Sequence, residues 1–161
     1  LFMLDVDCAS ASHAWIPGQR SSPYAMGLGW AVDLEKQGYF VGRRALEREH
    51  REGSSWQLAG LEIDWEGLER EYAAVGMPPQ VPASAVRGSI PVYAGPRQVG
   101  YASTSTWSPV LKKYIALVHL QQPYFTPGTK VEIEVTVEHH RHKSPATVAK
   151  LPFYDPEWKK K

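Results

Sequence analysis

Residues 87–120, R-G-S-I-P-V-Y-A-G-P-R-Q-V-G-Y-A-S-T-S-T-W-S-P-V-L-K-K-Y-I-A-L-V-H-L, contain three consecutive runs that predict β-strands. The runs cover Ser89–Tyr93, Val99–Thr106 and Tyr114–Leu120, and each is rich in β-branched, apolar or aromatic residues. A Gly-Pro pair follows the first run and a Ser-Pro pair follows the second, which is typical turn chemistry. The stretch therefore predicts an antiparallel meander.

The segments on either side of the meander extend the same architecture. Trp56–Ile63 has the composition of an opening strand, and Lys130–Glu138 alternates valine or isoleucine with charged residues, as a half-buried strand does. We expect a turn at His139–Lys143 and a returning strand at Pro145–Leu151. Residues 56–153 are thus predicted to form a closed antiparallel β-barrel of about six strands.

The chain before this barrel has a different pattern. Leu1–Val6 and Leu28–Val32 are short apolar runs that we interpret as buried strands. Phe40 to Glu52 has helical spacing of its apolar residues, and the sequence Gly-Ser-Ser follows it. The predicted fold class is an α+β fragment, the trailing piece of an α/β domain in residues 1–53, followed by an all-β antiparallel barrel in residues 54–161.

Composition excludes several classes of function. The 161 residues carry a net charge of only +1, so we expect no nucleic-acid partner and no anionic membrane surface. No apolar run approaches the roughly 20 residues that a membrane span needs. Cys8 is the only cysteine, which excludes an internal disulfide and a cysteine-based zinc site. A single cysteine fits a reducing compartment, so we expect a cytoplasmic location.

No catalytic constellation emerges from the residues. The cluster His139-His140-Arg141-His142 includes a cation that would repel a metal ion, and we interpret it as a solvated turn rather than a metal site. The hydroxyl run from Ser103 to Ser108 has no G-x-S-x-G elbow and no histidine partner. Glu62 and Asp64 lie on one face of a strand, and we expect them to be solvent-facing charges. These residues therefore point to binding rather than to catalysis.

Three stretches, in the right order, resemble aminomethyltransferases, the T-proteins of glycine cleavage. G-L-G-W-A-V-D-L…F-V-G-R-R-A-L (Gly27–Leu46) is similar to a signature of their folate-binding domain. G-Y-A-S-T-S-T-W-S-P-V-L-K-K-Y-I-A-L-V (Gly100–Val118) is similar to their C-terminal barrel, and P-G-T-K-V-E-I-E-V (Pro127–Val135) with L-P-F-Y-D-P (Leu151–Pro156) is similar to its terminal hairpin and tail. The resemblance spans most of the chain.

The resemblance implies a domain organisation and an activity. Residues 1–53 would be the C-terminal remnant of the folate-binding α/β domain, and residues 54–161 the aminomethyltransferase C-terminal β-barrel domain. The chain would then be part of a tetrahydrofolate-dependent one-carbon transferase. In that family the pterin-binding carboxylates and the catalytic aspartate come from earlier parts of the chain. We therefore expect an N-terminal part of the same protein as a partner, and a lipoyl carrier protein or a methylated small molecule as the donor.

The resemblance also marks three residues as candidates for binding folate. Trp30 is the tryptophan of the G-L-G-W signature, and Arg87 is the arginine that precedes the first strand of the meander. Trp158 falls where relatives carry a tyrosine or an arginine, so it departs from the family pattern. Each has an alternative: Trp30 as a core residue, Arg87 as a surface residue paired with a carboxylate, and Trp158 as part of an unstructured tail.

One departure keeps the reaction open at this point. Residues Asp64–Val86 connect the first barrel strand to Arg87, whereas compact T-proteins have a short link at this point. Folate-dependent demethylases and the folate domains of dimethylglycine and sarcosine dehydrogenases share this scaffold. A non-catalytic folate-binding protein, or a barrel that only supports a catalytic domain, could have the same fold. We expect these 161 residues alone to bind no folate measurably.

Overall fold

The computed structural model describes residues 21–82 and 84–160. The chain divides into two compact units, Leu1–Leu58 and Ala59–Lys161. The apolar run predicted at Leu1–Val6 and the single Cys8 lie outside the described residues. The assignment of the first unit to a folate-binding domain stays a prediction.

The first unit contains one short 3-10 helix, η4 (Gly29–Ala31), and one α-helix, α1 (Arg43–Glu52), within its described residues. Gly42 precedes α1 with φ 91°, and Gly53 follows it with φ 84° and donates its N–H to the Glu49 carbonyl at 2.8 Å. Both glycines adopt the left-handed region that other residues avoid. The helix therefore begins three residues later than the predicted Phe40, because the backbone at Gly42 cannot continue it.

The predicted buried strand at Leu28–Val32 is wrong. The Leu28 N–H donates to the Pro23 carbonyl at 2.7 Å, and the Ala31 N–H donates to the Leu28 carbonyl at 3.0 Å. These local hydrogen bonds form a turn and η4, and none of the three residues of η4 is buried. A short apolar run next to glycines is compatible with a strand or a helical turn, and periodicity alone does not separate the two.

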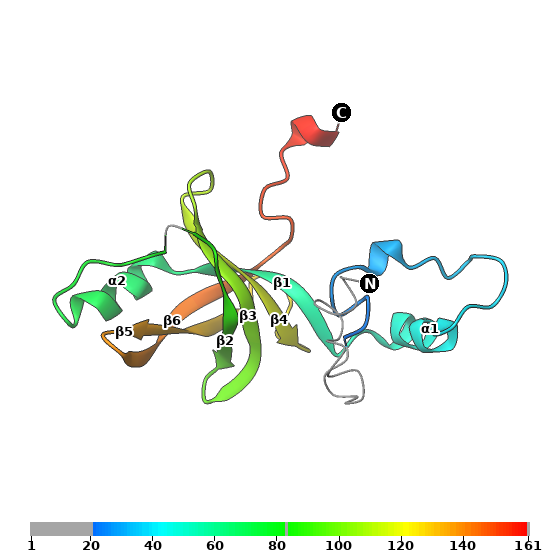
Figure 1. The fold of residues 1–161 in the computed structure, drawn as a ribbon, viewed down its shortest axis with the longest axis horizontal. Helices are drawn as coiled ribbons and strands as arrows, with labels where there is room; N and C mark the ends of the chain where they lie inside the picture. Colours follow the sequence, from blue (N-terminus) through cyan, green and yellow to red (C-terminus); the bar gives the residue numbers. More distant parts are fainter. Residues whose placement is uncertain (1–20, 83, 161) are drawn as a thin grey trace. The chain divides into compact units, whose positions relative to one another are not determined.

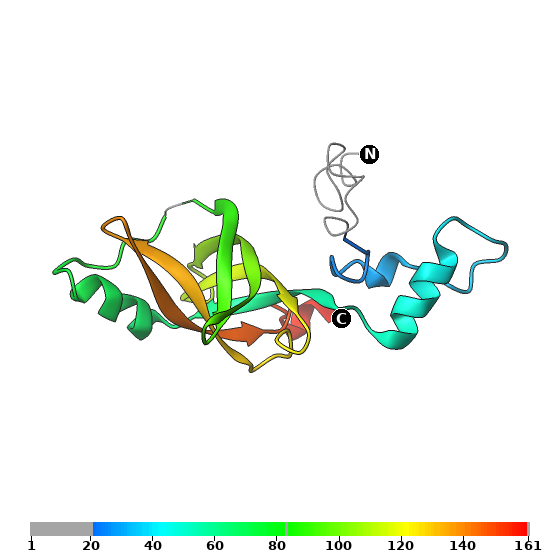
Figure 2. The same cartoon turned by 90° about the horizontal axis from the view of Figure 1, so that it is seen from below.

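The second unit is a closed barrel of six strands, which confirms the predicted fold class. The strands are β1 (Trp56–Ile63), β2 (Val86–Ala94), β3 (Arg97–Ser108), β4 (Lys113–Gln121), β5 (Lys130–Val137) and β6 (His140–Ala149). Their order around the barrel is β1-β4-β3-β2-β5-β6, and Figures 1 and 2 show the strands wrapping around one interior. The meander of β2, β3 and β4 lies as predicted.

Apolar side chains from every strand fill the barrel interior. On β5, Val131, Ile133 and Val137 are buried, as the alternation in the sequence predicts. The rest of the core consists of Ala59, Leu61, Ile63, Val92, Val99, Ala102, Ala116, Val118, Leu120, Ala146 and Val148.

The predicted five-residue turn at His139–Lys143 is wrong, because the hairpin turns over only two residues. Glu138 and His139 have φ values of 48° and 66°, which is the pattern of a tight two-residue turn with both central residues left-handed. The register then continues from Val137 opposite His140. Residues 140–143 are thus the first part of β6 rather than a solvated loop.

A helix and a connector lie between β1 and β2. The helix α2 (Trp65–Ala73) is followed by an irregular connector, which we define as residues 74–85 with Ala83 not described. Leu68 of α2 is 2% exposed, and the Glu71 carboxylate lies 2.8 Å from Nδ1 of His142 on β6. The Tyr72 hydroxyl donates to the Gln80 carbonyl at 3.1 Å. These contacts fix α2 and the connector on the barrel.

None of the helices formed by the described residues has both the length and the apolar character required to cross a bilayer.

Candidate functional site

Trp30 is exposed on η4 and lines an open cavity in the first unit. It is 84% exposed, so it is not a core residue among the described residues of this unit. The cavity has a volume of about 460 Å³ and is also lined by Tyr24, Glu49 and His50. The Tyr24 and His50 rings lie with centroids 5.8 Å apart. Aromatic walls beside a carboxylate suit a flat ring that carries hydrogen-bond donors.

The Glu49 carboxylate, which lines this cavity, is positioned by a hydrogen bond within the first unit. The Ser22 hydroxyl donates to the Glu49 carboxylate at 2.6 Å, and the Ala25 N–H donates to the Ser22 hydroxyl at 3.0 Å. Glu49 belongs to α1 and Tyr24 to the turn before η4. No sequence pattern indicated Glu49 or His50, because only the fold brings α1 beside that turn.

Arg87 lies near the start of β2, opposite Thr104 of β3. Its side chain is exposed and forms no ion pair or hydrogen bond with a described residue. Among the described residues, no surface carboxylate pairs with Arg87. A guanidinium that no described residue engages can donate two parallel hydrogen bonds to a ligand carboxylate.

Trp158 lies on the 3-10 helix η5 (Glu157–Lys160) and is 67% exposed. The tail that leads to η5 is ordered against the barrel at Phe153, whose ring packs on Gly60. Neither Trp158 nor Arg87 lines either of the two cavities described below for the barrel, and Trp30 belongs to the other unit. None of the three cavities described for residues 21–82 and 84–160 contains two of the three candidates.

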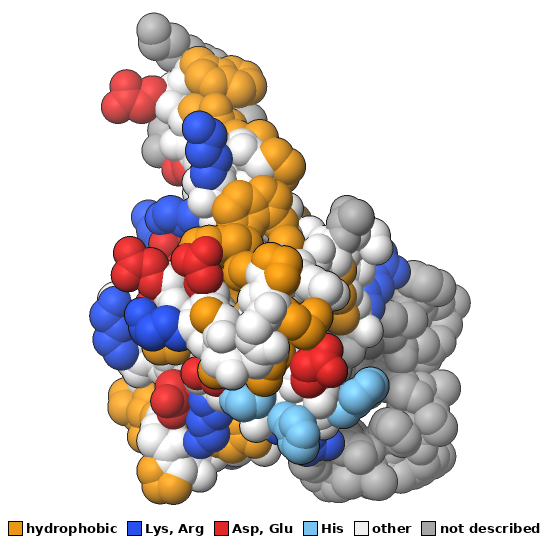
Figure 3. All heavy atoms as spheres, turned by 90° about the vertical axis from the view of Figure 1, so that its left-hand side faces the viewer, with side chains coloured by type: hydrophobic (Ala, Val, Ile, Leu, Met, Phe, Trp, Pro, Cys, Tyr) orange, Lys and Arg blue, Asp and Glu red, His pale blue; other side chains and the backbone are white. Residues whose placement is uncertain are grey.

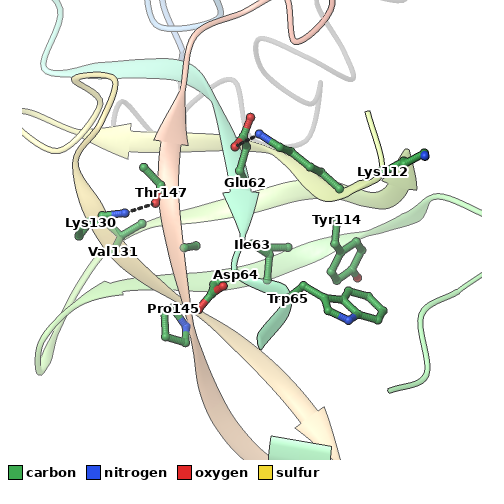
Figure 4. Close-up of a pocket in the computed structure, with 12 residues that line it drawn as sticks. Glu62, Ile63, Asp64, Trp65, Lys112, Tyr114, Lys130, Val131, Pro145 and Thr147 are labelled. Carbon is green, nitrogen blue, oxygen red and sulfur yellow. Dashed lines mark hydrogen bonds and ion pairs between the residues drawn. The ribbon is translucent and has the colours of Figure 1, made fainter. Parts of the chain in front are cut away.

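A cavity that the sequence did not predict lies where β1 ends (Figure 4). It has a volume of about 360 Å³, and Trp65 and Tyr114 form one side of it. Lys113 Nζ donates to the Glu62 carboxylate at 2.6 Å, and Lys130 Nζ donates to the Thr147 hydroxyl at 2.7 Å. Glu62 faces solvent, as expected, and it also forms an exposed ion pair between β1 and β4.

A second barrel cavity, of about 560 Å³, lies between β2 and β5 below α2. Its lining combines polar groups with apolar ones, and its apolar walls include Leu68, Ile90 and Val135. Tyr114 lines both cavities and shares a hydrogen bond of 3.2 Å with the Ser105 hydroxyl. The hydroxyl groups that line this second cavity include those of Tyr72, Ser89, Tyr114 and Thr136.

One buried histidine lies on β4, away from these cavities. His119 is 8% exposed and its ring stacks on Tyr101, with centroids 5.2 Å apart. Burial lowers the pKa of His119, because the charged imidazolium loses its hydration. Burial also raises the pKa of the Tyr101 hydroxyl. His119 is therefore neutral near pH 7.

The histidines of the β5–β6 hairpin do not gather with other ligands. Among residues 21–82 and 84–160, no group of three or more histidine, cysteine, aspartate or glutamate side chains could hold a metal ion. His142 instead pairs with Glu71 of α2. This histidine has a structural role that the sequence pattern did not reveal, since its partner lies far away in the chain.

Comparisons with known proteins agree with this architecture. Residues 70–155 match the model of the glycine cleavage T-protein C-terminal barrel domain. The chain is 32% identical over 134 residues to an aminomethyltransferase of Prochlorococcus marinus, covering 83% of this chain and 30% of that protein. It is also 32% identical over 133 residues to an aminomethyltransferase of Bacillus pumilus, covering 83% of this chain and 31% of the relative.

A solved structure has the same fold. The crystal structure of the glycine cleavage system aminomethyltransferase T from Bartonella henselae superposes with a TM-score of 0.61 and 19% sequence identity. The match covers 83% of this chain and 32% of that one. The chain thus spans about a third of the length of the proteins that it resembles.

Proposed function

Because the chain belongs to the family of the glycine cleavage T-protein C-terminal barrel domain, we propose that it forms the C-terminal part of a tetrahydrofolate-dependent aminomethyltransferase. The observation that carries the proposal is the family match over residues 70–155, supported by relatives named aminomethyltransferase over 83% of the chain. These relatives favour this function over the demethylase and dehydrogenase alternatives.

The side chains present fit a folate. Its pterin is a flat ring with hydrogen-bond donors, which suits the aromatic and carboxylate lining around Trp30. Its glutamate tail is anionic, which suits the guanidinium of Arg87, because no described residue forms an ion pair with it. Bound tetrahydrofolate would supply the amine nitrogens that accept the one-carbon unit.

This chain's own residues would bind and orient the cofactor. We assign ring contact to Trp30, an ion pair with the tail to Arg87, and a further aromatic contact to Trp158, which is 67% exposed on η5. The chemical step would use the catalytic carboxylate that the family carries in the N-terminal part of the protein. That part would be the first partner of this chain, and the donor would be an aminomethyl group on a carrier protein.

The test is a transfer assay with the longest natural protein that contains this chain. We expect labelled carbon to move from an aminomethyl donor to tetrahydrofolate, and we expect calorimetry to detect tetrahydrofolate binding. Transfer from methylated amines alone would instead support a demethylase. Folate binding without transfer from either donor would support a non-catalytic binding protein.

A further inference from the structure

The strands β2 and β5 diverge over most of their length. They pair only at Val92 with Ile133 and at Tyr93 with Glu132. On their other sides, β2 pairs with β3 from Val86 onward, and β5 pairs with β6 as far as Val137. Within the described part of the chain, the facing edges of residues 86–91 and 134–137 therefore have no strand between them. We call this opening the seam.

The cavity of about 560 Å³ occupies the seam and touches both strand edges. Three consecutive residues of β5, Glu134, Val135 and Thr136, line it. Beyond Ile133, no described strand pairs with β5 on the side that faces β2, so this strand edge borders the cavity without a strand partner. The backbone N–H and C=O groups of that edge are consequently available to a ligand. The remaining lining residues are Leu68, Tyr72, Gln80, Val81, Pro82, Val86, Ser89, Ile90, Pro91 and Tyr114.

The connector runs beside the seam but does not pair with it. Gln80, Val81 and Pro82 line the cavity, yet the backbone hydrogen bonds of the described connector residues go to α2. They run from the N–H groups of residues 74–77 to carbonyls of residues 70–73. Pro78, Pro79 and Pro82 have no N–H to donate. The connector thus walls the seam and leaves the strand edges for another extended chain.

The two faces of β5 at the seam differ in chemistry. Val135 packs against the barrel core, and Leu68 and Ile90 are apolar members of the same wall. Glu134 points to the outer face, and its side chain is only 16% exposed. Its nearest cation, Arg141, lies 3.6 Å away and is itself 78% exposed, and the Tyr93 hydroxyl lies 3.4 Å away. A largely buried carboxylate with such long contacts favours a further cation.

We propose that the seam binds an extended segment of another protein in which apolar and basic residues alternate. Such a segment would lie beside β5 at the usual strand spacing of about 4.8 Å and would bond to its backbone edge. Its apolar side chains would enter the cavity toward Leu68 and Val135, and its basic side chains would meet Glu134. The space-filling view toward α2 and the β5–β6 hairpin shows apolar side chains gathered between charged ones (Figure 3).

Arg87, which we assign to the folate tail, lies on the β2 edge of the seam but does not line its cavity, and neither Trp30 nor Trp158 lines it. The peptide site therefore does not rest on the proposed function. Its test uses the complete 161-residue chain and a labelled eight-residue peptide of alternating valine and lysine. Fluorescence anisotropy measures the affinity. Backbone NMR shifts locate the site, and we expect the changes to fall in residues 86–91 and 134–137. Circular dichroism establishes that each variant is folded.

Glu134→Gln should weaken peptide binding about tenfold, the scale of one charge-assisted hydrogen bond. Glu132→Gln is the matched control, since Glu132 is on the same strand where β2 and β5 are still paired, and it should change the affinity less than about twofold. A peptide methylated on alternate backbone nitrogens should lose binding, because it keeps its side chains but lacks the strand donors. The proposal is overturned if the parent peptide does not bind, if the methylated peptide binds equally well, or if the shifts fall elsewhere.

Discussion

Arg87 and Trp30 are polar and aromatic groups that the chain leaves exposed. Arg87 has no ionic partner within the described residues, and Trp30 is 84% exposed. A tryptophan whose only role is packing is commonly buried. An ion pair at the protein surface adds little to the free energy of folding, so a surface arginine without one loses little stability. Because both side chains are exposed, a ligand can reach them, and both therefore suit the proposed folate site.

Replacing Arg87 by alanine in the protein that contains the complete folate site should weaken tetrahydrofolate affinity by about 1.5–3 kcal/mol, the scale of a charged hydrogen bond. Arg87→Lys should recover only part of the loss, because lysine offers a point charge instead of a fork. Arg97→Ala is the control, since Arg97 donates to the Gln121 side chain at 3.3 Å. Calorimetry measures the affinities. Equal binding by the two alanine variants and the parent would refute the role of Arg87.

His119 should make stability depend on pH. Its folded pKa is lowered by burial from the ordinary value of 6.5, so the unfolded chain binds more protons below that pH. The free energy of unfolding should therefore fall as the pH drops from about 7.5 through 6.5, and level off below the folded pKa. The measurement is the urea midpoint at several pH values. In His119→Gln, the decrease in the free energy of unfolding between these pH values should vanish. If the variant and the parent show the same change with pH, His119 is not its cause.

Single elements differ in how far the sequence predicts them. The strands β3, β4 and β5 follow from their β-branched and alternating composition, because each is long enough to display a period of two. The five-residue run at Leu28–Val32 is too short for that test, and local bonds decide its structure. The pairing of Glu71 with His142 and the divergence of β2 from β5 depend on residues far apart in the chain. The candidate site depends on the same kind of contact, so the sequence could name Trp30 but not Glu49 or His50.

The junction of β3 and β4 requires a glycine at position 100. An added Cβ at Gly100 would overlap the His119 carbonyl oxygen and lie 2.8 Å from the Leu120 side chain. Gly100→Ala should therefore lower the free energy of unfolding by about 1–3 kcal/mol, the usual cost of overpacking. Gly88→Ala is the matched control, because it lies on β2 with nothing within 4 Å of its added Cβ. Urea denaturation compares the two, and equal stability would contradict the close approach of β4 to Gly100.

At the scale of the whole molecule, the two units differ in how much they bury. The barrel unit holds the entire core cluster. In the first unit, Ala25 is the one buried residue among the described residues 21–58, and Tyr39 and Val41 are 74% and 95% exposed. A unit with so little buried apolar surface gains little free energy from its own folding.

Hydrogen exchange should therefore separate the units in the 161-residue chain. Amides of α1 should exchange rapidly, since none of its residues is buried, whereas amides of β3 and β4 should exchange only through global unfolding of the barrel. Mass spectrometry of peptic fragments measures both in one sample. In the longest natural protein that contains this chain, α1 should become protected, because the proposed N-terminal partner would cover Tyr39 and Val41. Equal protection of α1 and β3 in the 161 residues alone would show that the first unit is stable by itself.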